Sequence, residues 1–125
     1  MKKAIHAPGA SPAIAPYSPA IKSGNLLFIS GQLPVLPDGS FPDDITGQTK
    51  QCLENLSTLL NAAGASLDNV VKCVVFIKDM NDFATINEAY GSYFNDTPPA
   101  RSCVEVARLP RDARIEIEAI AVLED

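Results

Sequence analysis

Hydrophobic residues between positions 45 and 63 recur every three or four positions, which is the spacing of one helix face. The apolar set is Ile45, Cys52, Leu53, Leu56, Leu59, Leu60 and Ala63. Gly64 follows at the place where many helices end in a left-handed residue. We therefore predict a helix over residues 45–63 with one buried face.

A second helical pattern begins near Asp79 or Asn81, since either side chain can cap a helix, and continues to about Phe94. Its apolar positions are Phe83, Ile86, Ala89, Tyr90, Tyr93 and Phe94. The segment Asn95-Asp96-Thr97-Pro98-Pro99 breaks the pattern. These residues predict a second amphipathic helix that ends ahead of a turn.

Strand patterns occupy much of the remaining chain. Residues 20–30 have apolar arms on both sides of a Ser23-Gly24-Asn25 turn, which predicts a hairpin. Residues 70–77 are almost continuously apolar and rich in β-branched side chains, as in a buried strand. Residues 100–107 and 113–123 predict two further strands, and the last of them alternates cleanly.

The order of these elements predicts an α+β fold, with a mixed β-sheet and two helices packed on one face. In the last strand, one face receives Ile115, Ile117 and Ala119, and the other receives Glu116, Glu118, Ile120 and Val122. Exposing several Val or Ile side chains forfeits about 1.5–3 kcal/mol each. Since two helices cover one face only, we predict a homo-oligomer that covers the other. A chain that covers this face itself is the alternative, but it needs more strands.

The composition describes one globular domain. The chain has 125 residues, of which 46% are hydrophobic and 20% are charged. Ten lysines and arginines against fifteen aspartates and glutamates give a net charge of −5. This charge argues against nucleic acid as the main partner, because phosphate backbones bind basic surfaces. No apolar run reaches the about 18 residues of a membrane-spanning helix.

The first residues carry positive charge, but His6, Pro8, Gly9 and Pro12 interrupt the apolar segment that an export signal needs. We therefore expect a cytoplasmic protein with free thiols. The cysteines are Cys52, Cys73 and Cys103, of which the first two are expected in the core. A single histidine nearly excludes zinc sites built on several histidines, and we predict no metal.

Four of the ten basic residues lie within fourteen positions of this acidic chain. They are Arg101, Arg108, Arg111 and Arg114. Such a local cationic patch suits a small carboxylate or phosphate, although the last three also fit solvated turn positions. Arg101 differs because it opens a strand just after Pro98 and Pro99. A guanidinium fixed there can bind a carboxylate through two parallel hydrogen bonds.

Glu118 is the second unusual position. It lies in the middle of the last strand, beside Ile120 and Val122, on the face assigned to subunit contact. A carboxylate there is costly unless it is paired or used. The pattern leaves two interpretations open, a salt bridge to a neighbouring arginine or a role in chemistry.

Three stretches carry a family resemblance: Ser30-Gly31-Gln32 followed by Pro34, residues 99–106, and residues 115–121. Together they closely resemble the Rid family, the reactive intermediate deaminases, also known as the YjgF-type or endoribonuclease L-PSP family. The similarity covers nearly the whole chain from Ala15 onward. It implies one Rid-type domain over residues 1–125 with a chorismate-mutase-like α+β fold. It also implies a homotrimer whose sheets form a central barrel, with sites in clefts between subunits.

The resemblance further implies an activity, the hydrolysis of reactive 2-enamine and 2-imine acids to 2-keto acids and ammonia. The implied substrates are 2-aminoacrylate/2-iminopropanoate and 2-iminobutanoate, and no cofactor or metal is expected. Arg101 would bind the substrate carboxylate, and Glu118 would hold and polarise the attacking water. The remaining pocket residues that the resemblance implies are Tyr17, Ser30, Gly31, Ser102 and Cys103.

Three further residues lie near the predicted site. Cys103 is expected to pack or to line the pocket rather than to react, because no base is near it in sequence. Glu105 is expected to form a structural ion pair. Asn87 lies off the apolar stripe of its helix, and capping of a neighbouring loop and contact with the pocket are both open for it, so it stays outside the predicted site.

Two other functions remain as alternatives. Family members have been described as ribonucleases or translation inhibitors, which the acidic charge of this chain disfavours. A non-catalytic module, binding small carboxylates or acting like a chaperone, would use the same arginine. Glu118 separates this module from the deaminase, because a pure binder gains nothing from a carboxylate beside an anionic ligand.

Overall fold

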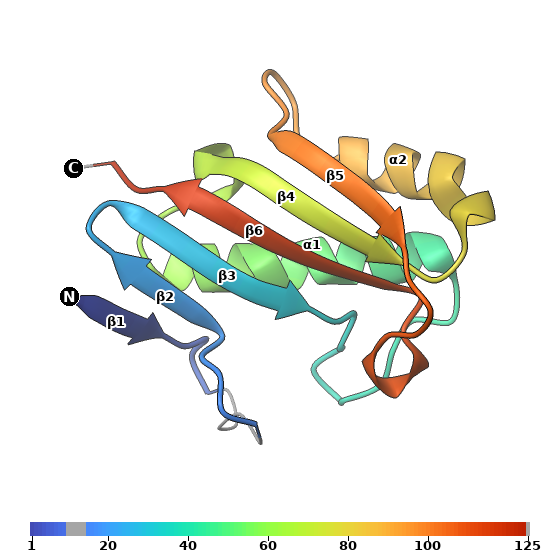
Figure 1. Ribbon diagram of the computed structural model, residues 1–125, viewed down its shortest axis with the longest axis horizontal. Coiled ribbons are helices and arrows are strands. Elements are labelled where there is room, and N and C mark those ends of the chain that lie inside the picture. The colour runs from blue at the N-terminus through green and yellow to red at the C-terminus, as the bar shows by residue number, and fades with distance from the viewer. Residues whose placement is uncertain (10–14, 125) are drawn as a thin grey trace.

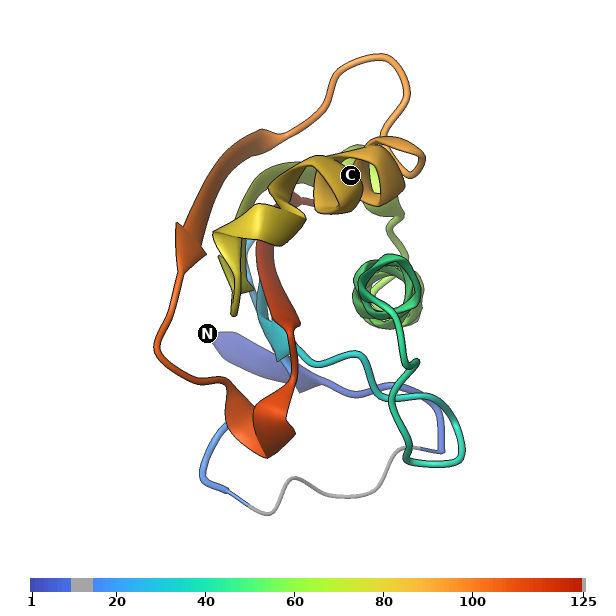
Figure 2. The same cartoon turned by 90° about the vertical axis from the view of Figure 1, so that its right-hand side faces the viewer.

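Six strands form one mixed sheet, and two helices pack on one of its faces (Figure 1, Figure 2). The computed structural model describes residues 1–9 and 15–124. The strands are β1 Lys2–Ile5, β2 Ala20–Ser23, β3 Leu26–Gln32, β4 Val70–Ile77, β5 Ala100–Glu105 and β6 Ile115–Val122. The helices are α1 Ile45–Ala62 and α2 Phe83–Gly91. This architecture confirms the predicted α+β fold with both helices on one side.

The strands lie in the order β1-β2-β3-β6-β4-β5. Every neighbouring pair is antiparallel except β4 and β5, which are parallel. The hairpin of β2 and β3 turns at Gly24, whose φ of 59° is in the left-handed region that glycine adopts at little cost. β6, although last in sequence, lies inside the sheet between β3 and β4, while β5 forms an edge.

α1 confirms the first predicted helix to within one residue. Asp44 caps its start, since its Oδ1 accepts a hydrogen bond from the Gly47 amide at 3.0 Å. Gly64, with φ at 79°, follows its end. The predicted stripe is buried, and its buried members are Ile45, Cys52, Leu53, Leu56, Leu59 and Leu60.

α2 is shorter than predicted at both ends. Asp79 does act as a cap, but its side chain accepts from the Asn81 amide and starts a 3₁₀ turn over Met80–Asp82. At the other end, the Ser92 hydroxyl donates to the Ala89 carbonyl oxygen at 2.6 Å. That carbonyl would otherwise accept from residue 93 in a continuing helix, so α2 stops at Gly91 rather than near Phe94.

The two faces of the sheet differ as the alternation in the last strand predicts. Ile115, Ile117, Ala119 and Ala121 are buried under the helices. The face turned away from the helices, called the open face below, retains partly exposed apolar side chains. Phe28 is 43% exposed, Leu26 37% and Val104 43%. The prediction of a sheet that is apolar on both faces is therefore confirmed.

Candidate active site

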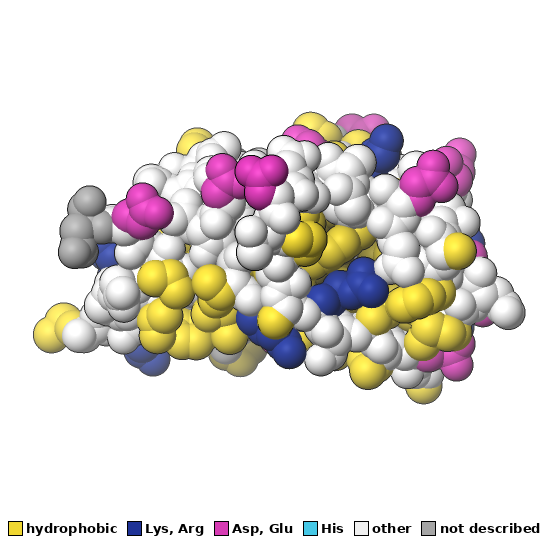
Figure 3. Space-filling model, turned by 90° about the horizontal axis from the view of Figure 1, so that it is seen from above, with side chains coloured by type: hydrophobic (Ala, Val, Ile, Leu, Met, Phe, Trp, Pro, Cys, Tyr) yellow, Lys and Arg dark blue, Asp and Glu magenta, His cyan; other side chains and the backbone are white. Residues whose placement is uncertain are grey.

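Arg101 is held in place by one face of α2. Its Nη1 donates a hydrogen bond to Oδ1 of Asn87 at 2.8 Å. Its guanidinium carbon lies 5.0 Å from the ring centre of Tyr90 and 5.6 Å from that of Phe83, within the range of cation–π attraction. Seen from the side of β5 and α2, the surface is hollowed, and hydrophobic and Lys or Arg side chains lie at the hollow (Figure 3). The guanidinium therefore has a fixed orientation within one chain.

Asn87 is the residue that sequence analysis missed. It lies off the apolar stripe of its helix, so the sequence pattern does not place it in the predicted site. The spacing of Phe83, Asn87 and Tyr90 at i, i+4 and i+7 nevertheless places all three on one helix face. A polar residue between two aromatic ones on the face turned toward Arg101 was the available signal.

The surroundings of the three cysteines indicate structural rather than reactive roles. Cys52 and Cys73 are fully buried, as predicted. Cys103 is half-buried on the helix side of β5. Burial raises the pKa of the Cys103 thiol, and the nearby Arg101 guanidinium opposes this only in part. The thiol is thus protonated at neutral pH, which supports the interpretation of a packing or pocket-lining residue.

A bulge in β3 brings Ser30 and Gly31 to Glu118. Ile29 pairs with Ala119 and Gln32 pairs with Ile117, so Ser30 and Gly31 together oppose the single residue Glu118. The Ser30 hydroxyl donates to the Ser18 carbonyl oxygen at 2.7 Å, which ties the segment next to Tyr17 to this bulge. Ser30, Gly31 and Glu118, together with the segment next to Tyr17, therefore lie near one another although they are far apart in the sequence.

Glu116 accompanies Glu118 on the open face. Its side chain packs over Gly31, where an added Cβ would lie 2.7 Å from Glu116 Cδ. Burial raises the pKa of Glu116, and the charge of Glu118 raises it further. A cavity of about 610 Å³ is lined by Glu116, Gly31, Tyr17 and Arg111 among others. Tyr17 is 59% exposed there.

Arg101 and Glu118 lie on opposite faces of the sheet. Cys73 of β4 pairs with Arg101 and with Ala119, so these three side chains share the helix face. Val74 pairs with Ser102 and with Glu118, which share the open face. Lys72 Nζ lies 3.3 Å from the hydroxyl oxygen of Ser102 and donates to it. A single chain therefore contains two half-sites, one around Arg101 and one around Glu118, and they lie on opposite faces of its sheet.

The other three arginines do not form a free cationic patch, because each of them has a partner within the chain. Arg108 forms an exposed ion pair with Asp112 at 2.8 Å. Arg111 stacks over the Phe41 ring at 4.4 Å and donates to the Gly39 carbonyl oxygen. Arg114 forms a partly buried ion pair. The interpretation as solvated turn residues therefore suits Arg108, while Arg111 and Arg114 are anchored by tertiary contacts.

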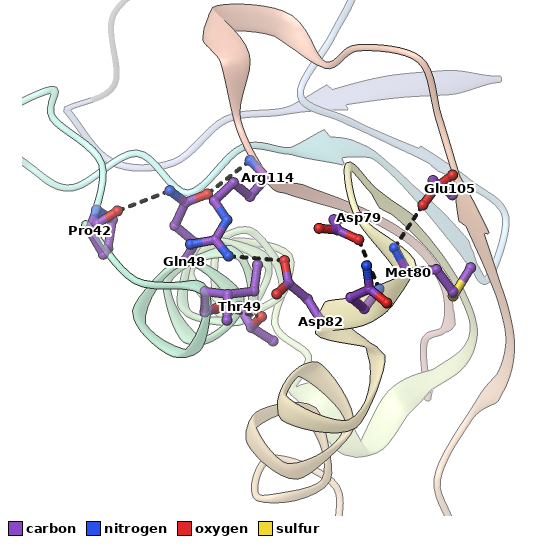
Figure 4. Close-up of polar contacts among 10 residues, drawn as sticks. Pro42, Gln48, Thr49, Asp79, Met80, Asp82, Glu105 and Arg114 are labelled. Carbon is purple, nitrogen blue, oxygen red and sulfur yellow. Dashed lines mark hydrogen bonds and ion pairs between the residues drawn. The ribbon is translucent and has the colours of Figure 1, made fainter.

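The interpretation of Glu105 as an ion-pair partner is wrong. Its Oε1 accepts a hydrogen bond from the Met80 backbone amide at 2.8 Å (Figure 4). Because the 3₁₀ turn presents an amide to the end of β5, the carboxylate pairs with the backbone rather than with a cation. The contact ties the end of β5 to the start of the helical segment.

Within residues 1–9 and 15–124, no three His, Cys, Asp or Glu side chains are close enough together to hold a metal ion. Neither helix there combines the length and the apolar character that crossing a bilayer requires.

Comparison with known proteins gives the family. Residues 7–123 match the model of the family described as Endoribonuclease L-PSP. The chain belongs to the endoribonuclease L-PSP family. This is the Rid or YjgF-type family that the sequence motifs resemble, so that recognition is confirmed.

Several family relatives are similar over almost their full length. A RutC family protein from Pyrococcus horikoshii is 53% identical, over 99% of this chain and 100% of its own. The protein named 2-iminobutanoate/2-iminopropanoate deaminase from Escherichia coli is 50% identical, over 98% of both chains. The crystal structure of E. coli TdcF with bound serine superimposes with a TM-score of 0.92 at 48% identity, covering 98% of this chain and 99% of that one.

Proposed function

We propose that this protein hydrolyses small 2-imino acids to 2-keto acids and ammonia. Its relatives at about half identity include proteins named 2-iminobutanoate/2-iminopropanoate deaminase, from E. coli at 50% and Salmonella typhimurium at 49%. The observation that carries the proposal is the setting of Arg101. One Nη atom is occupied by Asn87, and no other protein partner of its donors occurs within the described residues. The remaining donors suit a small carboxylate.

Glu118 is the proposed base for the attacking water. Water adds to the imine carbon while a proton passes to the Glu118 carboxylate, which gives a tetrahedral carbinolamine. The proton then moves to the amine nitrogen. As the C–N bond breaks, the hydroxyl proton passes to the Glu118 carboxylate and the carbonyl forms, and that proton is then given to the departing ammonia, which leaves as ammonium. A protonated imine is already electrophilic, so positioning of the substrate and of one water is the main contribution required.

The two half-sites come together between subunits in this proposal. Arg101 lies on the edge strand β5, while Glu118 lies on the open face beside Ser30 and Gly31. The exposed apolar side chains of that face support burial against other copies of the chain. We propose a homotrimer in which Arg101 of one subunit faces Glu118 of the next. Ser102, Cys103 and Tyr17 would complete the pocket walls.

The decisive experiment supplies the imine in situ. A dehydratase acting on serine or threonine generates 2-aminoacrylate or the butyrate imine, and keto-acid appearance is followed with and without this protein. Arg101→Lys keeps the charge but loses the planar fork of donors, so kcat/KM falls about 10²-fold or more while the oligomer stays intact. Full activity in that variant, or a single-copy particle by light scattering, would contradict the proposal.

The alternatives appear as other outcomes of the same assay. Binding of 2-oxobutanoate without any turnover would favour a non-catalytic carboxylate-binding module. RNA cleavage that persists in an Arg101/Glu118 double variant would favour a ribonuclease. The absence of a cofactor and a cytoplasmic location stay predictions of the sequence.

A further inference from the structure

Asp82 ends the 3₁₀ turn that leads directly into α2, and its side chain makes no capping hydrogen bond. Its backbone is helical, with φ at −82° and ψ at −1°, whereas a capping residue is ordinarily extended. Its side chain is thus available for another partner, and Asp82 Oδ2 accepts from Nη2 of Arg114 at 3.0 Å. The Asp82 side chain is 19% exposed and that of Arg114 40%. The carboxylate therefore ties the start of α2 to the residue that precedes β6.

Arg114 is itself fixed by Gln48 of α1. The Gln48 side chain is buried, with 6% exposure. Its Oε1 accepts from the Arg114 backbone amide at 3.0 Å, and its Nε2 donates to the Pro42 carbonyl oxygen at 3.0 Å (Figure 4). Asp82, Arg114 and Gln48, named the clasp below, thus join three parts of the chain at one end of the sheet.

The clasp adjoins the residues that hold Arg101. Phe83 directly follows Asp82, and Asn87 and Tyr90 lie on the same face of α2. All three contact the Arg101 guanidinium. α2 has nine residues, fewer than an isolated helix needs in water, so its placement depends on tertiary contacts.

We propose that the clasp is a positioning device that sets the angle of the Arg101 guanidinium for a substrate carboxylate. The inference rests on the proposed imine deamination. Among the described residues, no hydrogen bond or ion pair joins Asp82 or Arg114 to Arg101, so the effect passes through α2. When the ion pair is lost, the start of α2 relaxes, Asn87 and Phe83 shift with it, and the carboxylate is held less well.

The chain offers a matched control for the test. Arg108 and Asp112 form the other ion pair of the described residues, with side chains that are 77% and 72% exposed. Asp112→Asn removes the same charge without contact with α2. Asp82→Asn keeps the size of the side chain and leaves the Asp79 cap untouched, so α2 is expected to remain folded.

The experiment compares Asp82→Asn and Arg114→Gln with Asp112→Asn. Calorimetry measures the Kd of 2-oxobutanoate, and the coupled assay gives KM and kcat. In the first two variants we expect Kd and KM to rise about fivefold and kcat to stay within about twofold, a change typical of coupled neighbours. Asp112→Asn stays at wild-type values. In an Asn87→Ala background, Asp82→Asn adds a smaller loss than in the wild type, because the hydrogen-bonded part of its route to Arg101 is already cut and only the aromatic contacts remain.

Two results would overturn the inference. One is a lowered Tm in Asp82→Asn with unchanged Kd and KM, which describes an ordinary stabilising pair. The other is a full additional loss in the Asn87→Ala background. If the wild-type protein neither binds 2-oxobutanoate nor hydrolyses the imine, the proposed function fails. The NMR signal of the Arg101 Nε–H group then tests the clasp independently of the proposed function. An unchanged signal in Asp82→Asn refutes a positioning effect on Arg101.

Discussion

The surroundings of Arg101 and of Glu118 differ in how much of their support comes from a single chain. Arg101 has a hydrogen-bond partner and two aromatic rings from α2. Glu118 lies on the open face, opposite a strand bulge and beside a second carboxylate. The proposed substrate anchor is thus built within one chain, whereas the proposed water-holding side depends on what covers the open face.

The largest effect is expected at Glu118. Glu118→Gln removes the proposed base but keeps the shape, so kcat falls about 10²- to 10⁴-fold. The Kd of 2-oxobutanoate stays within about threefold, because the Arg101 half-site is untouched. Steady-state kinetics and calorimetry measure the two quantities. Glu88→Gln, at an exposed position of α2, is the control. Unchanged turnover in Glu118→Gln would remove this residue from the mechanism.

A smaller effect is expected at Gly31, where the Glu118 half-site is most crowded. An added Cβ would lie 2.7 Å from Glu116 Cδ, so Gly31→Ala displaces that side chain or the bulge. Overpacking of this kind costs about 1–3 kcal/mol of unfolding free energy. We expect a lower free energy of unfolding in urea titrations. We also expect kcat/KM to fall about tenfold, because the displacement moves residues next to Glu118.

Gly91→Ala is the matched control for this variant. An added Cβ there meets no atom within 4 Å. Since alanine is the better helix former, this substitution stabilises α2 by about 0.5–1 kcal/mol. Equal losses in the two variants would show that the crowding of Gly31 against Glu116 is unimportant.

The smallest effect concerns the pH dependence of stability. The folded-state pKa of Glu116 is raised above its ordinary value of 4.5, first by burial and then by Glu118. The folded state therefore holds this proton more tightly than the unfolded state does. The stabilising contribution is fully present below pH 4.5 and is lost as pH rises through the folded-state pKa.

Glu116→Gln is the test of this dependence. We expect the Tm of the variant to fall less than that of the wild type as pH rises from about 4 to 7. Thermal unfolding in a pH series measures this difference. Glu124→Gln, at an exposed position beyond the end of β6, should keep the wild-type slope. A Tm slope that is identical in Glu116→Gln and in the wild type would contradict the assignment.

Much of the fold was predictable because it rests on local patterns. The spacing of apolar residues in 45–63 and the alternation in 115–122 each specify a buried face on their own. The boundaries of α2 were not predictable, since they depend on how Asp79 and Ser92 use their side chains. A side chain that hydrogen-bonds to a nearby backbone group competes with helix formation. Sequence spacing does not reveal whether that hydrogen bond or the continued helix forms.

The site was predictable in part for a similar reason. Arg101 stood out because it opens a strand just after Pro98 and Pro99, and Glu118 because it is a carboxylate beside Ile120 and Val122 on an apolar face. Asn87 did not, because its role depends on a strand that is remote in sequence. The anchoring of Arg111 and Arg114 also depends on partners far along the chain, at Gly39, Phe41 and Asp82.

The sequence by itself determined the elements, the two-sided apolar sheet and the charged residues set into it, because periodicity and local chemistry belong to each segment separately. Only the tertiary structure decided that Arg101 faces α2 while Glu118 faces away from it. That outcome follows from strand register, which pairs Cys73 with Arg101 and Val74 with Glu118. Register depends on contacts between distant segments, and a shift of one residue would reverse every side chain in a strand.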